Sequence, residues 1–222
     1  MGQAFGQMLA SAVGIAISPL PLIAVVLMLA TPKGKVNGTA FTLGWVVALA
    51  AVTAAVVALG SGLDTGSAKP TWSYWLKLAL GLLFLLLAAQ QWHGRPREGR
   101  ASEPPKWMAA IDRFTPAKAA GLAAVLVAAN PKNLVLAVGG AVSIATSGAS
   151  TGGKIGAGAL MVLIGSLCAL LPLAVYFLGG DNSARILGSW KAWMAVHNAA
   201  IMIVLLTVLG AKYVGDAVAA LT

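Results

Sequence analysis

Six long apolar segments divide this 222-residue chain and limit what it can fold into. A helix needs about 20 mostly apolar residues to cross the hydrocarbon core of a bilayer. The segments occupy residues 7–30, 36–60, 75–92, 118–146, 155–179 and 193–214. Charged residues make up 9% of the chain, against about 25% in ordinary soluble domains. The sequence therefore predicts an all-α polytopic membrane protein with six transmembrane helices.

Basic residues are distributed unevenly among the segments that connect the predicted helices. Ten of them follow the first, third and fifth helices, and four lie on the opposite side. The ten are Lys33, Lys35, Arg95, Arg97, Arg100, Lys106, Arg113, Lys118, Arg185 and Lys191, and the four are Lys69, Lys77, Lys154 and Lys212. Because cytoplasmic loops are enriched in lysine and arginine, we expect a multi-pass protein of the bacterial plasma membrane with both termini extracytoplasmic. This topology accounts for most of the net charge of +9, so nucleic acid is not an expected partner.

The longest hydrophilic segment, residues 93–117, separates two halves with three predicted helices each. Its density of proline, glycine and mixed charge is typical of a flexible connector. We therefore expect a first three-helix repeat at residues 1–92, a cytoplasmic linker at 93–117 and a second three-helix repeat at 118–222.

The two halves carry the same features in the same order. These are a proline break (Ser18-Pro19-Leu20-Pro21 and Asn130-Pro131-Lys132), a glycine-spaced turn (34–38 and 152–156) and a tryptophan pair (Trp72/Trp75 and Trp190/Trp193). Because each half has an odd number of helices, the second half must be inverted in the membrane. Inverted repeats with broken first helices indicate a transporter whose site lies near the membrane midplane. The glycine-spaced faces also permit a homodimer.

Lys132 lies in the middle of the apolar segment 118–146. A cation at this depth costs about 2.5 kcal/mol or more and usually marks a functional site. The six acidic residues all fall in predicted connections or at helix ends, so none is expected to neutralise it. Three arrangements remain open: a lysine neutralised by desolvation, an ammonium bound to carbonyls freed by the prolines, or a substrate that acts as the counterion. A purely structural lysine is the competing interpretation.

The candidate substrate-binding residues surround the two proline breaks. Helices that restart after a break present backbone amides that bind anions. The candidates are Ser18, Pro19, Pro21, Asn130, Pro131, Lys132, Asn133, His197 and Asn198. His197 is included as a possible proton carrier because histidine titrates near neutral pH, the alternative being a histidine that packs between helices. The sequence has no catalytic triad, phosphate loop or metal-binding spacing, so we expect no enzyme activity, no metal and no cofactor.

Several of these motifs resemble one family. They are the run 17–23 (Ile-Ser-Pro-Leu-Pro-Leu-Ile), the basic turn Lys33–Lys35, Gly44-Trp45, Asn130-Pro131-Lys132, and the ending Trp193…His197-Asn198-Ala199-Ala200-Ile201. Together they resemble the GAP-like proteins of actinobacteria, which include sulfolipid- and glycopeptidolipid-addressing proteins of the lysine-exporter superfamily. The resemblance covers nearly the whole chain. It implies a six-helix exporter-type protein of the plasma membrane, linked to moving lipids or glycolipids towards the cell surface. Amino-acid exporters of that superfamily usually have Pro-Gly-Pro where this chain has Pro19-Leu20-Pro21.

Three functions follow from these expectations. The leading one is a transporter or flippase for an anionic lipid or glycolipid, such as a polyprenyl-linked one, with its headgroup at Lys132 and its tail in the bilayer. The second is a proton-coupled exporter of a small solute such as an amino acid. The third is an accessory subunit of a larger lipid-export complex that docks through residues 93–116.

Overall fold

A computed structural model describes residues 2–61, 71–94, 110–111 and 113–221 of the chain. The regular structure within these ranges is helical, and they contain no strand. The helices are α1 (Gly2–Ala16), α2 (Pro19–Leu29), α3 (Gly34–Ser61), α4 (Thr71–His93), α5 (Pro116–Ala128), α6 (Pro131–Ala145), α7 (Thr151–Gly165), α8 (Leu167–Leu178), the short 3₁₀ turn η2 (Gly180–Asn182) and α9 (Ser183–Leu221). The all-α prediction is confirmed for this part of the chain.

Three of these helices, α3, α4 and α9, are long and apolar enough to cross a membrane unaided. Three further pairs pass the same test together but bend at a short break. The bends are 41° between α1 and α2, 66° between α5 and α6, and 58° between α7 and α8. The chain is therefore a multi-pass membrane protein with three spans, or up to six if each bent pair counts as one.

The first two breaks have nearly the same backbone geometry. Ser18 precedes α2 with φ −75° and ψ 115°, and Asn130 precedes α6 with φ −80° and ψ 113°. A proline follows each as the first residue of the new helix. Proline disfavours the helical conformation in the residue before it, which places that residue in the extended region. The predicted proline breaks are therefore present at matching positions, while the inverted arrangement of the two halves stays a prediction.

A third break, at Ser166, interrupts the segment that the sequence predicted as one helix over residues 155–179. Ser166 ends α7 and precedes α8, and Pro172 lies inside α8. Proline removes one helical hydrogen bond and crowds the carbonyl four residues earlier, here that of Cys168. The bend lies just before that crowded turn, whereas α3, the corresponding helix of the first half, is continuous.

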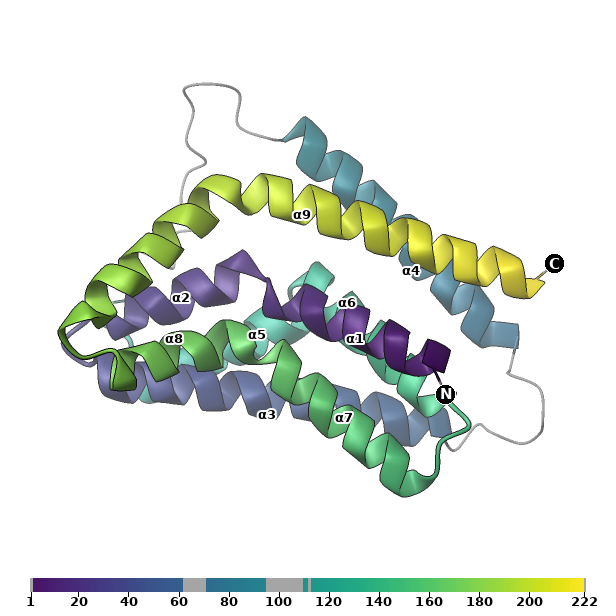
Figure 1. Cartoon of the computed structure of the whole chain (residues 1–222), viewed down its shortest axis with the longest axis horizontal. Coiled ribbons are helices and arrows are strands. Elements are labelled where there is room, and N and C mark those ends of the chain that lie inside the picture. The colour runs from purple at the N-terminus through teal and green to yellow at the C-terminus, as the bar shows by residue number, and fades with distance from the viewer. Residues whose placement is uncertain (1, 62–70, 95–109, 112, 222) are drawn as a thin grey trace.

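The short helices that follow the proline breaks form the centre of the molecule. Nearly every residue of α2 and of α6 is buried. Helix α6 packs against α1 and α3, and α2 packs against α8, α3 and α9. Figure 1 shows α2 and α6 between α9 on one side and α3 on the other. Backbone groups freed by a break inside a membrane must be satisfied by protein, water or ligand, and this placement allows that.

Two long helix contacts depend on small residues. A Cβ atom added to Gly44 of α3 would lie 2.7 Å from the backbone of Ala120 in α5. Gly81 of α4 faces Gly210 of α9 in the same way, with the Gly210 carbonyl oxygen 3.0 Å from such a Cβ position. The pair α4 and α9 runs side by side along much of its length (Figure 1). Small residues let membrane helices approach closely enough for backbone contact.

The last helix differs from its prediction. The sequence predicted a helix over residues 193–214 preceded by a basic connection, but α9 runs from Ser183 to Leu221 and is curved (Figure 1). Arg185 and Lys191 therefore lie on the helix, since the chain remains helical beyond the apolar segment. Most of the predicted linker, residues 95–109 and 112, lies outside the described residues, and the three-part division of the chain stays a prediction.

Candidate functional site

The side chain of Lys132 is buried in the centre of the molecule. It is 3% exposed, and its Nζ atom donates a hydrogen bond to Ser18 Oγ at 3.0 Å. Lys132 is the second residue of α6, and Ser18 is the residue immediately before α2. This bond therefore joins the two proline breaks, which lie 114 positions apart in the sequence.

Ser18 is also hydrogen-bonded to Asn133. Its hydroxyl donates to Asn133 Oδ1 at 2.8 Å, and Asn133 Nδ2 donates to the carbonyl oxygen of Leu126 at 2.9 Å. Leu126 lies in the last turn of α5, where the break leaves carbonyl groups without their helical partners. We call Lys132, Ser18 and Asn133 the Lys132 cluster. It connects an ammonium group to a freed backbone carbonyl through neutral groups.

The helix start beside Lys132 is already partly capped. Asn130 Oδ1 accepts a hydrogen bond from the Lys132 backbone amide at 3.1 Å. At α2 the situation differs, because Pro19 and Pro21 have no amide hydrogen to offer. Each helix start thus presents fewer free amides than an ordinary helix, and the Lys132 ammonium is the main positive group at this point.

The third break brings a further residue to the Lys132 cluster. Cys168, the second residue of α8, lies close enough to Lys132 to interact with it electrostatically. Its thiol is buried and lies 3.5 Å from the Gly165 carbonyl oxygen. The third break therefore lies in the neighbourhood of Lys132. The sequence carried a signal for this in Pro172, but its consequence for Cys168 and Ser166 was not predicted.

The ion pairing seen in the described part of the chain does not involve Lys132. Across the described ranges, the ion pair that meets the usual distance criterion is Lys212–Asp216 on α9, at 2.7 Å, and no carboxylate pairs with Lys132. A second lysine is nevertheless buried, because Lys77 in α4 is 8% exposed. Lys132 is therefore not the one buried lysine, although it lies in the centre of the fold.

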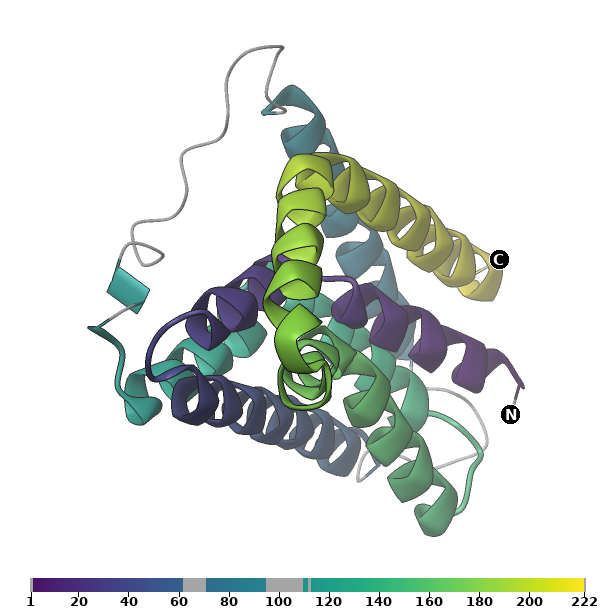
Figure 2. The same ribbon diagram turned by 60° about the vertical axis from the view of Figure 1, so that its left-hand side comes forward.

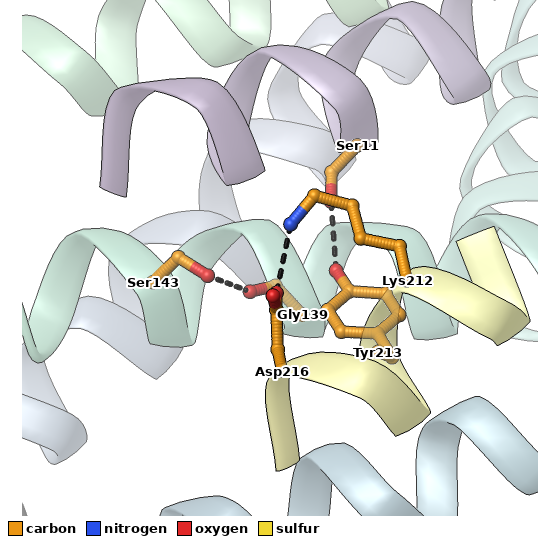
Figure 3. Close-up of polar contacts among 6 residues, drawn as sticks. All are labelled: Ser11, Gly139, Ser143, Lys212, Tyr213 and Asp216. Carbon is orange, nitrogen blue, oxygen red and sulfur yellow. Dashed lines mark hydrogen bonds and ion pairs between the residues drawn. The ribbon is translucent and has the colours of Figure 1, made fainter. Parts of the chain in front are cut away.

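A second polar group occupies the contact between α1, α6 and α9 (Figure 3). Ser11 Oγ and Tyr213 Oη are 3.0 Å apart, and Ser143 Oγ donates to the Gly139 carbonyl oxygen at 2.9 Å. The Tyr213 hydroxyl packs directly on Gly139, leaving no room for a side chain there. Ser11 of α1 is thus bonded to α9.

His197 and Asn198 do not join the Lys132 cluster. The His197 side chain is exposed on α9, stacks on Trp193 with ring centroids 4.5 Å apart, and has Nδ1 2.8 Å from the Trp193 carbonyl oxygen. Asn198 is half-buried on the same helix. Of the nine candidates, Lys132, Ser18, Asn133 and Asn130 are linked by hydrogen bonds, while Pro19, Pro21 and Pro131 shape the breaks.

The described ranges contain no group of three or more His, Cys, Asp or Glu residues that could hold a metal ion. The arrangement that remains is a buried cation held by neutral hydrogen-bonding groups. Such a group can attract an anion and can hold it by hydrogen bonds.

Neither the curated proteins nor the solved structures include a match to this chain. The family model of Sap, the sulfolipid-1-addressing protein, matches residues 8–219 and so extends over both halves and all three breaks. The chain therefore belongs to the sulfolipid-1-addressing protein family.

Proposed function

We propose that this protein is a transporter or flippase that moves an anionic lipid or glycolipid across the plasma membrane towards the cell surface. The observation that supports it most is the buried Lys132 ammonium, held where two proline-broken helices meet and bonded to neutral groups. The protein acts without covalent chemistry, so it is not an enzyme. Its partners are membrane lipids and not nucleic acid.

The hydrogen bonds around Lys132 leave two of its three donors for a substrate anion. A lysine ammonium has three donors, and the hydrogen bond to Ser18 uses one of them. A buried charge without a counterion is costly, so an anion that enters this site gains both Coulomb attraction and hydrogen bonds. A phosphate or sulfate headgroup supplies such an anion, and its chains stay among the apolar helices.

The family name agrees with this chemistry. Sulfolipid-1, which the family name mentions, is by its own name a sulfur-containing lipid. If the chain shares the predicted lysine-exporter ancestry and the inverted repeat, its two halves move against each other at the helix breaks. This motion exposes the site to each side of the membrane in turn. For the homodimer we propose the start of α7, because Gly152 and Gly156 have no atom within 4 Å of an added Cβ. The corresponding Gly38 of α3 is already covered by Leu29.

The decisive test is transport and lipid retention by Lys132→Ala. We expect purified wild-type protein in proteoliposomes to move a fluorescent anionic lipid between leaflets, and Lys132→Ala to lose this activity while remaining folded. Lys132→Arg keeps the charge and should retain part of it. Lys118→Ala, an exposed lysine on the other half of the same bent pair, is the matched control. Full activity in Lys132→Ala would show that the site is elsewhere.

A second candidate, a proton-coupled exporter of a small solute, is favoured by the depth of the site. Lys132 is 3% exposed and α2 and α6 are almost wholly buried, so a small anion or zwitterion reaches it with less rearrangement than a lipid headgroup. Counterflow of a radiolabelled amino acid in vesicles distinguishes the two. Solute counterflow that depends on Lys132, without lipid movement, would favour this candidate.

A further inference from the structure

A large cavity lies between α3 and the bent pair α7–α8, apart from the Lys132 cluster. Its volume is about 1020 Å³, at the upper end of the roughly 300–1,000 Å³ usual for ligand sites. Most of its lining is aliphatic, and the exposed side chains of Leu43, Ile155 and Leu163 lie at its rim. The cavity therefore opens at the side of the helix bundle, between two membrane-spanning elements.

Two residues that line this cavity have buried hydroxyl groups with no hydrogen-bond partner among the described residues. They are Thr53 of α3, which is 3% exposed, and Ser166 at the α7–α8 break, which is 0% exposed. An unsatisfied buried hydroxyl is unfavourable, and membrane interior offers no bulk water to satisfy it. Two such groups in one cavity therefore point to a ligand that carries oxygen atoms.

The charged residue of the lining is Lys154, in the first turn of α7. Helices α3 and α7 run in opposite directions here, because Gly158 faces Thr53 and Gly165 faces Leu49. Along α7, Lys154 and Ser166 are about 18 Å apart at about 1.5 Å per residue. This is close to half of the roughly 30 Å hydrocarbon thickness. The polar residues of the lining thus span about one leaflet, with the cation at the helix start.

We propose that this cavity binds one anionic acyl lipid from a single leaflet. Its headgroup lies at Lys154, an ester oxygen accepts a hydrogen bond from Thr53, and an oxygen atom on the chain accepts one from Ser166. The aliphatic walls hold the remaining chain. Under the predicted topology, the Lys154 end faces outside, so the lipid belongs to the outer leaflet. The cavity would hold this lipid whether or not Lys132 takes part in transport.

Filling the cavity tests the occupant directly. Gly158 lines the cavity, and an added Cβ meets nothing closer than Thr53 Cγ2 at 3.8 Å, so a leucine side chain there projects into the space. Gly121 of α5 lies outside the lining, with no atom within 4 Å of its Cβ position. We expect native mass spectrometry with dioleoyl phosphatidylglycerol to show loss of one bound lipid in Gly158→Leu but not in Gly121→Leu. Equal retention in both variants would overturn the proposal.

Removing the hydroxyl of Thr53 has two expected effects of opposite sign. Thr53→Val should weaken phosphatidylglycerol binding by about 2- to 10-fold, the range for one hydrogen bond. The same variant should melt at a higher temperature in delipidated detergent, because an unpaired buried hydroxyl has been replaced by a methyl group. Thr39→Val is the control, since Thr39 is half-buried on α3 outside the cavity lining and its hydroxyl donates to the Lys35 carbonyl oxygen. A higher melting temperature with unchanged lipid binding would mean that water alone visits the cavity, and would overturn the proposal.

Two lipid comparisons test the polar contacts at the ends of the cavity. Wild type should prefer phosphatidylglycerol to uncharged diacylglycerol with the same chains, and Lys154→Gln should lose that preference. The wild-type protein should also bind a lipid with ricinoleoyl chains, which carry a hydroxyl group, about 2- to 10-fold more tightly than the same lipid with oleoyl chains. Ser166→Ala should bind the two chains equally. If the wild type binds phosphatidylglycerol and diacylglycerol equally, the proposed contact with Lys154 is wrong. If it binds ricinoleoyl and oleoyl chains equally, the proposed contact with Ser166 is wrong.

Discussion

At the scale of single residues, Ser18 has the most connected role. Its hydroxyl accepts a hydrogen bond from Lys132 and donates one to Asn133, so it acts as both acceptor and donor. It can do so because the following proline keeps its backbone extended and directs its side chain away from its own helix. A serine before a proline thus becomes the connection between two helices that are distant in sequence.

Asn133 gives the first test of this network. Asn133→Leu should reduce the free energy of unfolding by about 1–3 kcal/mol, because the carbonyl of Leu126 and the hydroxyl of Ser18 both lose a buried partner. Equilibrium unfolding in mixed detergent micelles measures the difference. Asn198→Leu is the control, since Asn198 is half-buried on α9 away from the network. An equal loss in both variants would contradict the role of Asn133.

At the scale of helices, the bent pairs differ in how far the sequence predicts them. The α1–α2 and α5–α6 breaks follow from local rules, since Pro19 and Pro131 each begin a helix and act on the residue before them. The α7–α8 bend is different, because Pro172 lies several residues beyond it and the bend also depends on packing. The sequence did not predict that α9 includes Arg185 and Lys191. The length of an apolar segment predicts the part of a helix inside the membrane, but not how far the helix continues into a polar region.

The same distinction applies to the candidate site. Lys132 stood out because a charge in an apolar segment is rare. Its bond to Ser18 was not predictable from spacing, since it joins residues 114 positions apart. Cys168 lies near the site because of the α7–α8 bend, whose effect on Cys168 was not predicted. His197 lies outside the site because its face of α9 is exposed.

The contact between α3 and α5 provides a test at the scale of helices. Gly44→Leu should destabilise the protein by about 1–3 kcal/mol, because its side chain must displace the backbone of Ala120. Gly121→Leu in α5 should have little effect, since nothing lies within 4 Å of its Cβ position. Thermal unfolding of both variants in one detergent makes the comparison. A tolerated Gly44→Leu would mean that these helices do not approach as closely as described.

At the scale of the whole molecule, α1 begins and α9 ends at the same end of the bundle (Figure 1, Figure 2). This agrees with an even number of crossings, which the count of up to six allows. The positive-inside rule adds the expected direction, with this end outside the cell.

Labelling of single cysteines tests that orientation. In a Cys168→Ala background, Gly148→Cys should react with a membrane-impermeant maleimide on intact cells, and Arg113→Cys should react only after lysis. Both positions are exposed, so differences in labelling report the side of the membrane. Unmodified protein should not react, because Cys168 is buried. The reverse pattern would invert the topology, and labelling of both on intact cells would mean that the α5–α6 pair between them does not cross the membrane.

The bond between Ser11 and Tyr213 also bears on how the chain is made. It joins residues 202 positions apart and closes the contact of α1 with α9 over Gly139 of α6. During synthesis, α1 and α6 reach the membrane well before Tyr213 leaves the ribosome, and the face of α6 at Gly139 stays uncovered until then. Assembly of the central helices is therefore completed only near the end of translation. A nascent chain stopped before α9 should depend on insertion chaperones or be degraded, even though most of its membrane segments are complete.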